Sequence, residues 1–272
     1  MCSKRVILYS HGGLGNQLFQ YAFARHLSTL YDAKITVERI LGFKLDRTYR
    51  RKFELTAILG INFKRSYMIS ISLLIVMLLK KVGINKITNL YTVITDIDDP
   101  DQISSKMRSY RYIFVIGYFQ KYEYAESSKV INEISQNLIT RSKDREFRIA
   151  ILIRTFNEVA SKDERDIRNR HLTEYLSMLK SLLALPENKI FTKILYTTSK
   201  KLRSELNVGI DDSKTHRELL QNICNSDIIY LNNSTLYLWA GYVAQKNGSI
   251  INSFFVPEEL CMPGWKRHDR NH

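Results

Sequence analysis

The sequence predicts an α/β protein with parallel sheets and two domains. Short apolar, β-branched runs alternate with helical patterns along most of the 272 residues, as expected for strands joined by helical crossovers. The first run, Val6–Tyr9, leads through a glycine-rich turn into a helix. A charged stretch at 140–146 has no apolar period, so we expect the domains to cover residues 1–140 and 147–272.

The first strand, turn and helix form the most informative part of the chain. Gly12, Gly13 and Gly15 lie between the strand and the helical pattern that starts at Asn16. Because the first N–H groups of a helix have no partner within it, this turn is a candidate anion site. The alternative is that the turn only connects the strand to the helix and binds no ligand. It is neither the dinucleotide motif GxGxxG nor a P-loop.

The rest of the first half predicts three more strands. Apolar runs place them at Lys34–Val37, Tyr91–Ile94 and Tyr112–Ile116. Residues 39–64 predict a basic loop with a short helix, residues 96–101 an acidic turn, and residues 123–139 one helix.

The second half repeats the alternation. Strands are predicted at residues 147–153, 190–196, 227–231 and 250–251. A charged loop is expected through Arg170, followed by a helix that Thr173 caps. Two further helices are predicted at residues 218–224 and after Thr235, and residues 257–265 are expected to be irregular.

The composition is unusual only in its charge. There are 41 Lys and Arg against 27 Asp and Glu, which gives a formal charge of +14. Such a charge favours an anionic partner, which could be nucleic acid, phosphorylated sugars or an acidic membrane face. The alternative is a solvated basic surface without a single target. Nucleic acid is disfavoured because the sequence has no RNP motif, helix-turn-helix or zinc finger. Cys2, Cys224 and Cys261 give neither a disulfide framework nor a zinc site.

Two apolar segments bear on location. The run before Ser10 is too short for a signal peptide, which predicts a cytoplasmic protein. Tyr67–Leu79 is uncharged between Arg65 and Lys80, but a membrane span needs about 20 residues. We expect a buried helix or strand pair there. The alternative is an apolar surface that contacts the inner face of an anionic membrane.

Two groups of residues could bind phosphate in the second half. Arg154 follows a predicted strand, at the edge where open α/β sheets bind ligands, and a guanidinium can hold two pyrophosphate oxygens. Asn233, Ser234 and Thr235 begin a predicted helix, whose N-terminus binds anions. The alternatives are a solvated arginine and simple helix capping.

The run GGLGNQLFQYAFA at Gly12–Ala24 resembles the N-terminal motif of the α-1,2-fucosyltransferases, glycosyltransferase family 11. The segment GYFQ at Gly117–Gln120 is also similar to that family. The pattern from Glu218 to Val243, which includes NNSTLYLWAGYV, follows the family's C-terminal helix, strand, Asn-Ser-Ser/Thr and Trp-containing helix. The resemblance therefore covers nearly the whole chain.

This resemblance implies a GT-B fold of two facing Rossmann-like domains and an inverting transfer without a metal. The first domain would bind the acceptor, a glycan or lipid-linked oligosaccharide, and the second a nucleotide-sugar donor. The implied activity moves L-fucose from GDP-fucose in an α-1,2 linkage, as in surface-polysaccharide or O-antigen synthesis. The donor-binding residues are then expected to be Gly13, Gly15, Asn16, Arg154, Asn233, Ser234 and Thr235.

The chain departs from the family after the strand that ends before Arg154. The family has His-x-Arg-Arg-Gly-Asp where this chain has residues 152–157, and only the first arginine, Arg154, is retained. We therefore expect Arg154 to hold the donor phosphates and the nearby Glu158 to act as the catalytic base. Another nucleotide-sugar donor, or a silent member that binds without transfer, remains an alternative.

Overall fold

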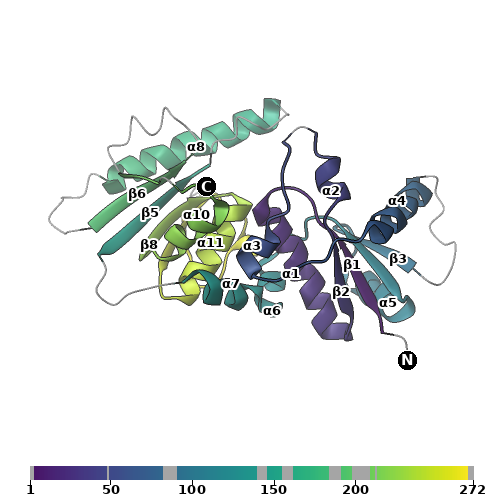
Figure 1. Ribbon diagram of the computed structural model, residues 1–272. Helices are drawn as coiled ribbons and strands as arrows, with labels where there is room; N and C mark the ends of the chain where they lie inside the picture. Colours follow the sequence, from purple (N-terminus) through teal and green to yellow (C-terminus); the bar gives the residue numbers. More distant parts are fainter. Residues whose placement is uncertain are drawn as a thin grey trace. The chain divides into compact units, whose positions relative to one another are not determined.

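A computed structural model describes residues 3–47, 49–81, 91–139, 146–154, 162–183, 191–197, 209–211 and 213–268. The chain divides into two compact units, residues 1–137 and 138–272. Each unit contains one parallel β-sheet flanked by helices (Figure 1).

The first unit contains a four-stranded sheet in the order β2-β1-β4-β3, with every neighbouring pair parallel. Its strands are β1 (Arg5–Tyr9), β2 (Lys34–Glu38), β3 (Tyr91–Thr95) and β4 (Tyr112–Ile116). Its helices are α1 (Leu14–Tyr31), α2 (Leu41–Lys44), α3 (Leu55–Leu59), α4 (Tyr67–Lys81), α5 (Pro100–Ser109), α6 (Tyr122–Ser127) and α7 (Val130–Leu138).

Alternation along the strands of this sheet gives it two buried faces. Ile7 and Phe114 pack with Leu73 and Val76 of α4 on one face. Successive strand residues point to opposite faces, so the buried Val6 and its neighbours face the other side. The segment at Tyr67–Leu79 is therefore a helix with one face on the core.

Two local predictions for the first unit are confirmed in outline but differ in detail. The predicted helix at residues 123–139 is two helices, because Lys129 between them has a left-handed backbone with φ of 61°. The acidic turn contains the start of α5. There the Asp99 side chain accepts a 2.8 Å hydrogen bond from the Gln102 N–H, and Pro100 occupies the first helical turn.

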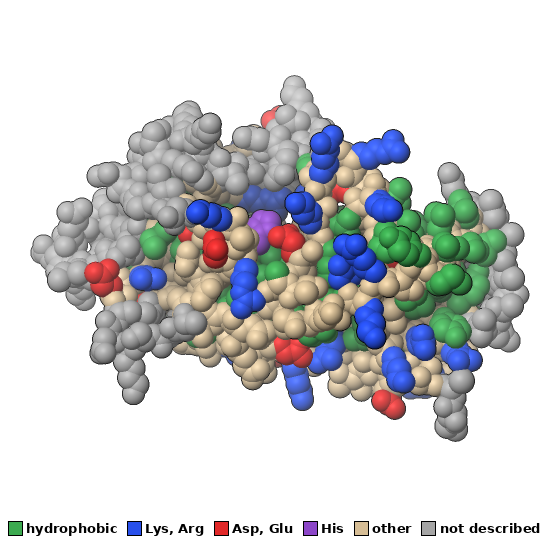
Figure 2. Space-filling view, viewed as in Figure 1, with side chains coloured by type: hydrophobic (Ala, Val, Ile, Leu, Met, Phe, Trp, Pro, Cys, Tyr) green, Lys and Arg blue, Asp and Glu red, His purple; other side chains and the backbone are tan. Residues whose placement is uncertain are grey.

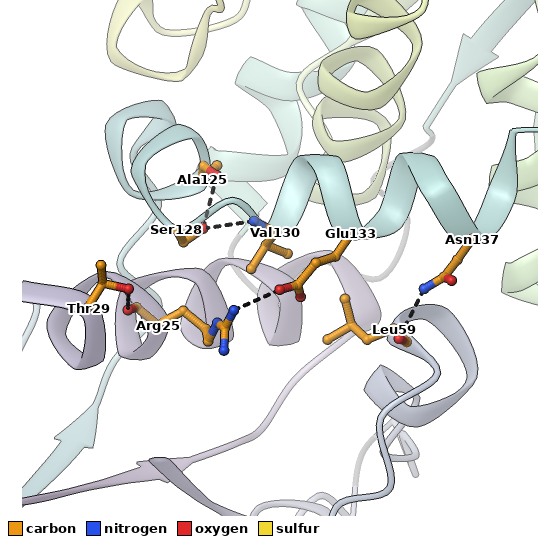
Figure 3. A network of polar contacts seen from close by, with 8 residues as sticks. All are labelled: Arg25, Thr29, Leu59, Ala125, Ser128, Val130, Glu133 and Asn137. Carbon is orange, nitrogen blue, oxygen red and sulfur yellow. Dashed lines mark hydrogen bonds and ion pairs between the residues drawn. The ribbon is translucent and has the colours of Figure 1, made fainter. Parts of the chain in front are cut away.

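Polar contacts bind α7 to the first unit (Figure 3). Arg25 Nη2 of α1 donates a 2.7 Å hydrogen bond to Glu133 Oε1 of α7. Asn137 Nδ2, near the end of α7, donates to the Leu59 carbonyl at 3.0 Å, which satisfies a C-terminal carbonyl of α3. These contacts fix α7 against two helices that precede it by many residues.

The second unit contains a six-stranded parallel sheet in the order β10-β9-β8-β5-β6-β7. Its strands are β5 (Phe147–Ile153), β6 (Phe191–Thr197), β7 (Gly209–Ile210), β8 (Ile228–Asn232), β9 (Ile250–Phe254) and β10 (Lys266–His268). Its helices within the described residues are α8 (Lys162–Leu183), α10 (His216–Cys224), α11 (Thr235–Lys246) and the 3-10 turn η1 (Glu258–Leu260).

Helix α8 packs on one face of this sheet, where Tyr175 and Leu179 contact Ile151 and Ile153. After α8 the chain enters β6, which pairs with one side of β5. The later strand β8 pairs with the other side of β5, and α11 then connects β8 to β9, one strand further in that direction. The topology therefore switches between β5 and β8, which is the position where open α/β sheets bind ligands.

The predicted start of α8 was wrong. The helix begins at Lys162, within the expected charged loop, and Thr173 lies inside it. Thr173 Oγ1 donates a 3.0 Å hydrogen bond to the Asn169 carbonyl one turn earlier and does not cap an end.

Candidate functional site

Arg154 lies at the topological switch of the second unit, directly after β5. Its N–H donates a 3.2 Å hydrogen bond to Asn232 Oδ1, and Asn232 Nδ2 donates to the Arg154 carbonyl at 3.2 Å. Asn232 ends β8, the neighbouring strand, and is buried. This reciprocal pair fixes the backbone from which the Arg154 side chain extends.

The predicted helix-start residues lie beside Arg154. Arg154 Nη1 donates a 3.5 Å hydrogen bond to Ser234 Oγ. Ser234 is the N-cap of α11, yet its side chain forms no capping hydrogen bond. Thr235 is the first residue of the helix, and Asn233 is the half-buried residue between β8 and the cap. A guanidinium and the first N–H groups of a helix therefore meet at one point, an arrangement suited to phosphate.

Two buried tyrosines support this edge of the sheet. Tyr237 donates from its hydroxyl to the Tyr196 carbonyl at 3.3 Å, and Tyr175 donates to the Leu152 carbonyl at 3.2 Å. Burial raises the pKa of Tyr237 to about 12, although the positive charge of Arg154 opposes the shift. Burial also raises the pKa of Tyr175. Both hydroxyls therefore stay protonated and remain donors that hold the strand ends.

The glycine-rich turn of the first unit precedes a helix that starts earlier than predicted. Gly13 is the N-cap of α1, and both Gly15 and Asn16 lie in its first turn. Gly12 has φ of +79°, which lets the chain turn from β1 into the helix. Asn16 Oδ1 accepts a 3.1 Å hydrogen bond from Gln120 Nε2, so the two family-like segments meet in this unit.

The GYFQ segment that contains Gln120 has a specific backbone. Asp96 accepts hydrogen bonds from the N–H groups of Tyr118 and Phe119 at 2.8 and 2.6 Å. Phe119 has φ of 52°, and its ring stacks on Phe23 at 4.0 Å. A Cβ added to Gly117 would lie 2.5 Å from Asp96 Oδ2, so this position needs glycine. The carboxylate thus positions the segment at the end of β4.

Sequence reasoning missed the buried amides of α1. Gln17 Nε2 donates to the Gly12 and Lys52 carbonyls at 3.0 and 2.8 Å, which ties the turn to the loop before α3. Gln20 Oε1 accepts from the His11 N–H at 3.1 Å. Both glutamines are fully buried, and their place inside an apolar helical pattern was the available clue.

His11, just after β1, packs between two aromatic rings. Its ring centroid lies 4.9 Å from that of Tyr9 and 4.8 Å from that of Tyr118. Burial lowers the pKa of His11, although a hydrogen bond with the Tyr9 carbonyl and the charge of Asp96 oppose the shift. The folded protein therefore favours the neutral imidazole.

This lowered pKa makes stability depend on pH. As the pH falls below the ordinary value of 6.5, the unfolded chain binds a proton at His11 before the folded one does, so the free energy of unfolding decreases. In His11→Gln that contribution is absent. We expect the stability difference between parent and variant, measured by urea unfolding, to change between about pH 7.5 and pH 5. A difference that is constant over this range would contradict the assigned pKa direction.

The proposed base lies outside the described residues. Glu158, like residues 155–157 of the divergent motif, belongs to a segment that the structure does not describe. Over the part of the chain that is described, no group of three or more His, Cys, Asp or Glu side chains is arranged to hold a metal.

No protein-family model matches the chain, and no curated protein matches its sequence. Its fold resembles several solved structures. POFUT1 in complex with GDP is 9% identical with a TM-score of 0.51, over 94% of this chain and 99% of that chain. A mutant of Arabidopsis thaliana FUT1 in complex with GDP is 15% identical with a TM-score of 0.49, over 96% and 72%. The fucosyltransferase NodZ from Bradyrhizobium is 10% identical with a TM-score of 0.44, over 89% and 93%.

The likeness to POFUT1, together with the two parallel sheets, confirms the predicted α/β fold of GT-B type. At this level of identity it concerns the fold.

Proposed function

We propose that this protein is a glycosyltransferase that uses a nucleotide sugar. One observation carries the proposal: Arg154 Nη1 contacts Ser234 Oγ at the N-terminus of α11, at the topological switch of a parallel sheet. This site offers a guanidinium, a hydroxyl and free N–H groups to a pyrophosphate. The fold neighbour POFUT1 is itself in complex with GDP, which supports a guanine nucleotide as the leaving group.

The finer proposal is that GDP-fucose donates L-fucose in an α-1,2 linkage, as in family 11. The acceptor hydroxyl would attack the anomeric carbon while the bond to GDP breaks and Glu158 takes the hydroxyl proton. Arg154 would bind the charge that remains on the departing diphosphate. The acceptor would be a glycan or lipid-linked oligosaccharide in surface-polysaccharide or O-antigen synthesis, at the cytoplasmic side of a membrane. We propose that transfer needs no metal, so EDTA should leave it unchanged.

The experiment is a screen of nucleotide sugars by thermal shift and by donor hydrolysis. We expect GDP-fucose and GDP to raise the melting temperature, since a ligand that binds only the folded state stabilises it. We also expect slow release of fucose from GDP-fucose. Stabilisation by a uridine donor alone would support a different donor, and a panel without any stabilising nucleotide would contradict the proposal.

A second candidate is a silent member that binds the nucleotide sugar without transfer. It rests on the loss of the family's residues around Arg154 at positions 152–157. Tight binding of GDP-fucose with neither hydrolysis nor transfer to any glycan of an acceptor panel would favour it.

A further inference from the structure

The surface of the first unit contains a basic pocket of about 440 Å³. It lies where the segment after β2, the loop before α3 and the start of α4 meet. Five cationic side chains line it: Arg39, Lys44, Arg51, Lys52 and Arg65. Among the described residues that line the pocket there is no acidic side chain. Such a concave cluster of one sign attracts anions.

Two carboxylates close in sequence, Glu38 and Asp46, neutralise these cations only in part. Glu38 is buried and accepts hydrogen bonds from the Ile40 N–H at 2.7 Å and from Ser70 Oγ at 2.8 Å. Asp46 accepts hydrogen bonds from the N–H groups of Tyr49 and Arg51. The hydrogen bond from Tyr49, together with the charge of Arg51, lowers the pKa of the Asp46 carboxyl, so Asp46 offsets part of the Arg51 charge. Across the described ranges, none of the five cationic side chains forms an ion pair with a carboxylate. Five cationic side chains against one nearby carboxylate that is not buried leave the pocket with a net positive charge.

Part of the pocket is preorganised. Arg39 Nη1 donates a 2.6 Å hydrogen bond to the Phe63 carbonyl, and its guanidinium lies 4.9 Å from the ring centroid of Phe53. Lys44, Lys52 and Arg65 are exposed, so their charged groups are accessible to a ligand. A fixed guanidinium with exposed cationic side chains around it suits phosphate groups.

An exposed apolar surface adjoins the pocket. The outer face of α4 carries six apolar side chains, each between 44% and 73% exposed: Tyr67, Met68, Ile71, Leu74, Ile75 and Leu78. Figure 2 shows hydrophobic side chains gathered over this helix, with Lys and Arg side chains beside them. Tyr67 belongs to both surfaces because it also lines the pocket. A contiguous apolar patch of this kind marks an interaction surface.

We propose that the pocket and the outer face of α4 together dock onto a bilayer that contains anionic phospholipids. The apolar face would lie in the boundary between headgroups and acyl chains, and the five cations would bind lipid phosphates. None of the described helices is long and apolar enough to cross a membrane, so α4 would lie in the plane of the interface.

Charge complementarity favours this occupant over two others. A two-fold contact between copies of the chain would bring two five-cation pockets toward each other, which is repulsive. A polynucleotide would match the charge but would leave the six aliphatic and aromatic side chains of α4 largely uncovered, because its backbone is hydrophilic. An anionic bilayer offers phosphates and an apolar layer within one headgroup depth.

This inference extends the proposed membrane-side transferase by naming the surface that contacts the membrane. Its test needs neither donor nor acceptor, so its failure would leave the proposed transfer reaction standing. The full chain is sedimented with vesicles of phosphatidylcholine alone or with phosphatidylglycerol added. We expect binding to the second kind only, and weaker binding at high salt.

The charge arm uses the triple variant Lys44→Gln, Lys52→Gln, Arg65→Gln. We expect it to lower partitioning onto phosphatidylglycerol vesicles about 100-fold, from about fivefold for each basic residue removed. The control triple Arg5→Gln, Lys34→Gln, Arg108→Gln has the same net charge. Its residues are exposed and lie at or near the amino ends of the strands of the same sheet, whereas the pocket follows the carboxyl end of β2. This control should therefore bind nearly as the parent does. Equal losses in the two triples would overturn the proposal.

The apolar arm uses Ile71→Asn with Ile75→Asn. We expect partitioning to fall at least about tenfold, because these side chains would no longer enter the interface. The control pair Ile97→Asn and Ile250→Asn changes exposed isoleucines outside α4 and should bind as the parent does. Vesicle binding that the α4 pair does not alter would overturn the proposal. Two other results would also overturn the proposal, each with a parent protein that binds no vesicle. In one the parent forms a dimer that the α4 pair disrupts, and in the other it binds a polynucleotide through the three pocket cations.

Discussion

Replacing Arg154 by alanine is expected to weaken donor binding and to slow transfer about 10²–10³-fold, roughly 3–4 kcal/mol of transition-state stabilisation. In the proposed reaction, negative charge leaves with the nucleotide, and the guanidinium lies beside the N-terminus of α11 where that charge would be bound. Arg154→Lys should lose most of the same effect, because an ammonium lacks the planar pair of donors that matches two phosphate oxygens.

The measurements are donor affinity and transfer rate, with circular dichroism to verify the fold. The contacts between Arg154 and Asn232 use the Arg154 main chain, so the alanine variant retains them. Arg170→Ala provides a matched control, since this arginine is exposed on α8 and should cost less than about threefold. Normal affinity of Arg154→Ala for every nucleotide sugar that the parent binds would move the donor site elsewhere.

The sequence was most informative about residues at strand ends. Arg154 was selected because it follows a predicted strand, and Ser234 because it begins a predicted helix. The structure brings both to the switch between β5 and β8. The role of Asn232 was not predictable. Its side chain acts on a residue 78 positions away, and only the pairing of β5 with β8 determines that proximity. Local periodicity contains no information on such pairing.

The local errors have separate physical causes. The first two turns of α8 are highly charged, so they resemble a loop when apolar periodicity is the criterion. Thr173 suggested a cap because a threonine hydroxyl can satisfy a free N–H group, but the same hydroxyl can also bond to the preceding turn. The left-handed backbone of Phe119 is fixed by Asp96 from another strand end, so sequence alone could not predict it.

Gly42 shows how closely two loops of the first unit approach each other. A Cβ added there would lie 2.1 Å from the Ser10 carbonyl oxygen and 2.9 Å from His11 Cβ. The Ser10 N–H also donates to the Glu38 carbonyl at 3.1 Å, which continues the pairing of β1 with β2 and fixes the Ser10 backbone. The obstructing atom is backbone, and it cannot rotate away as a side chain would.

We therefore expect Gly42→Ala to lower the free energy of unfolding by about 3 kcal/mol, through overpacking and displacement of the turn that leads to Asn16. Gly13→Ala is the matched control in the same unit, because its nearest neighbour would be Arg51 Nε at 3.9 Å. Neither glycine has positive φ, so backbone strain does not separate the two variants and the available space does. Gly13→Ala should lower stability by no more than about 1 kcal/mol in urea unfolding, since alanine is a poorer N-cap than glycine. Similar losses in the two variants would show that the β1 and α2 loops are not packed this closely, and the placement of His11 and Asn16 at this edge would lose its support.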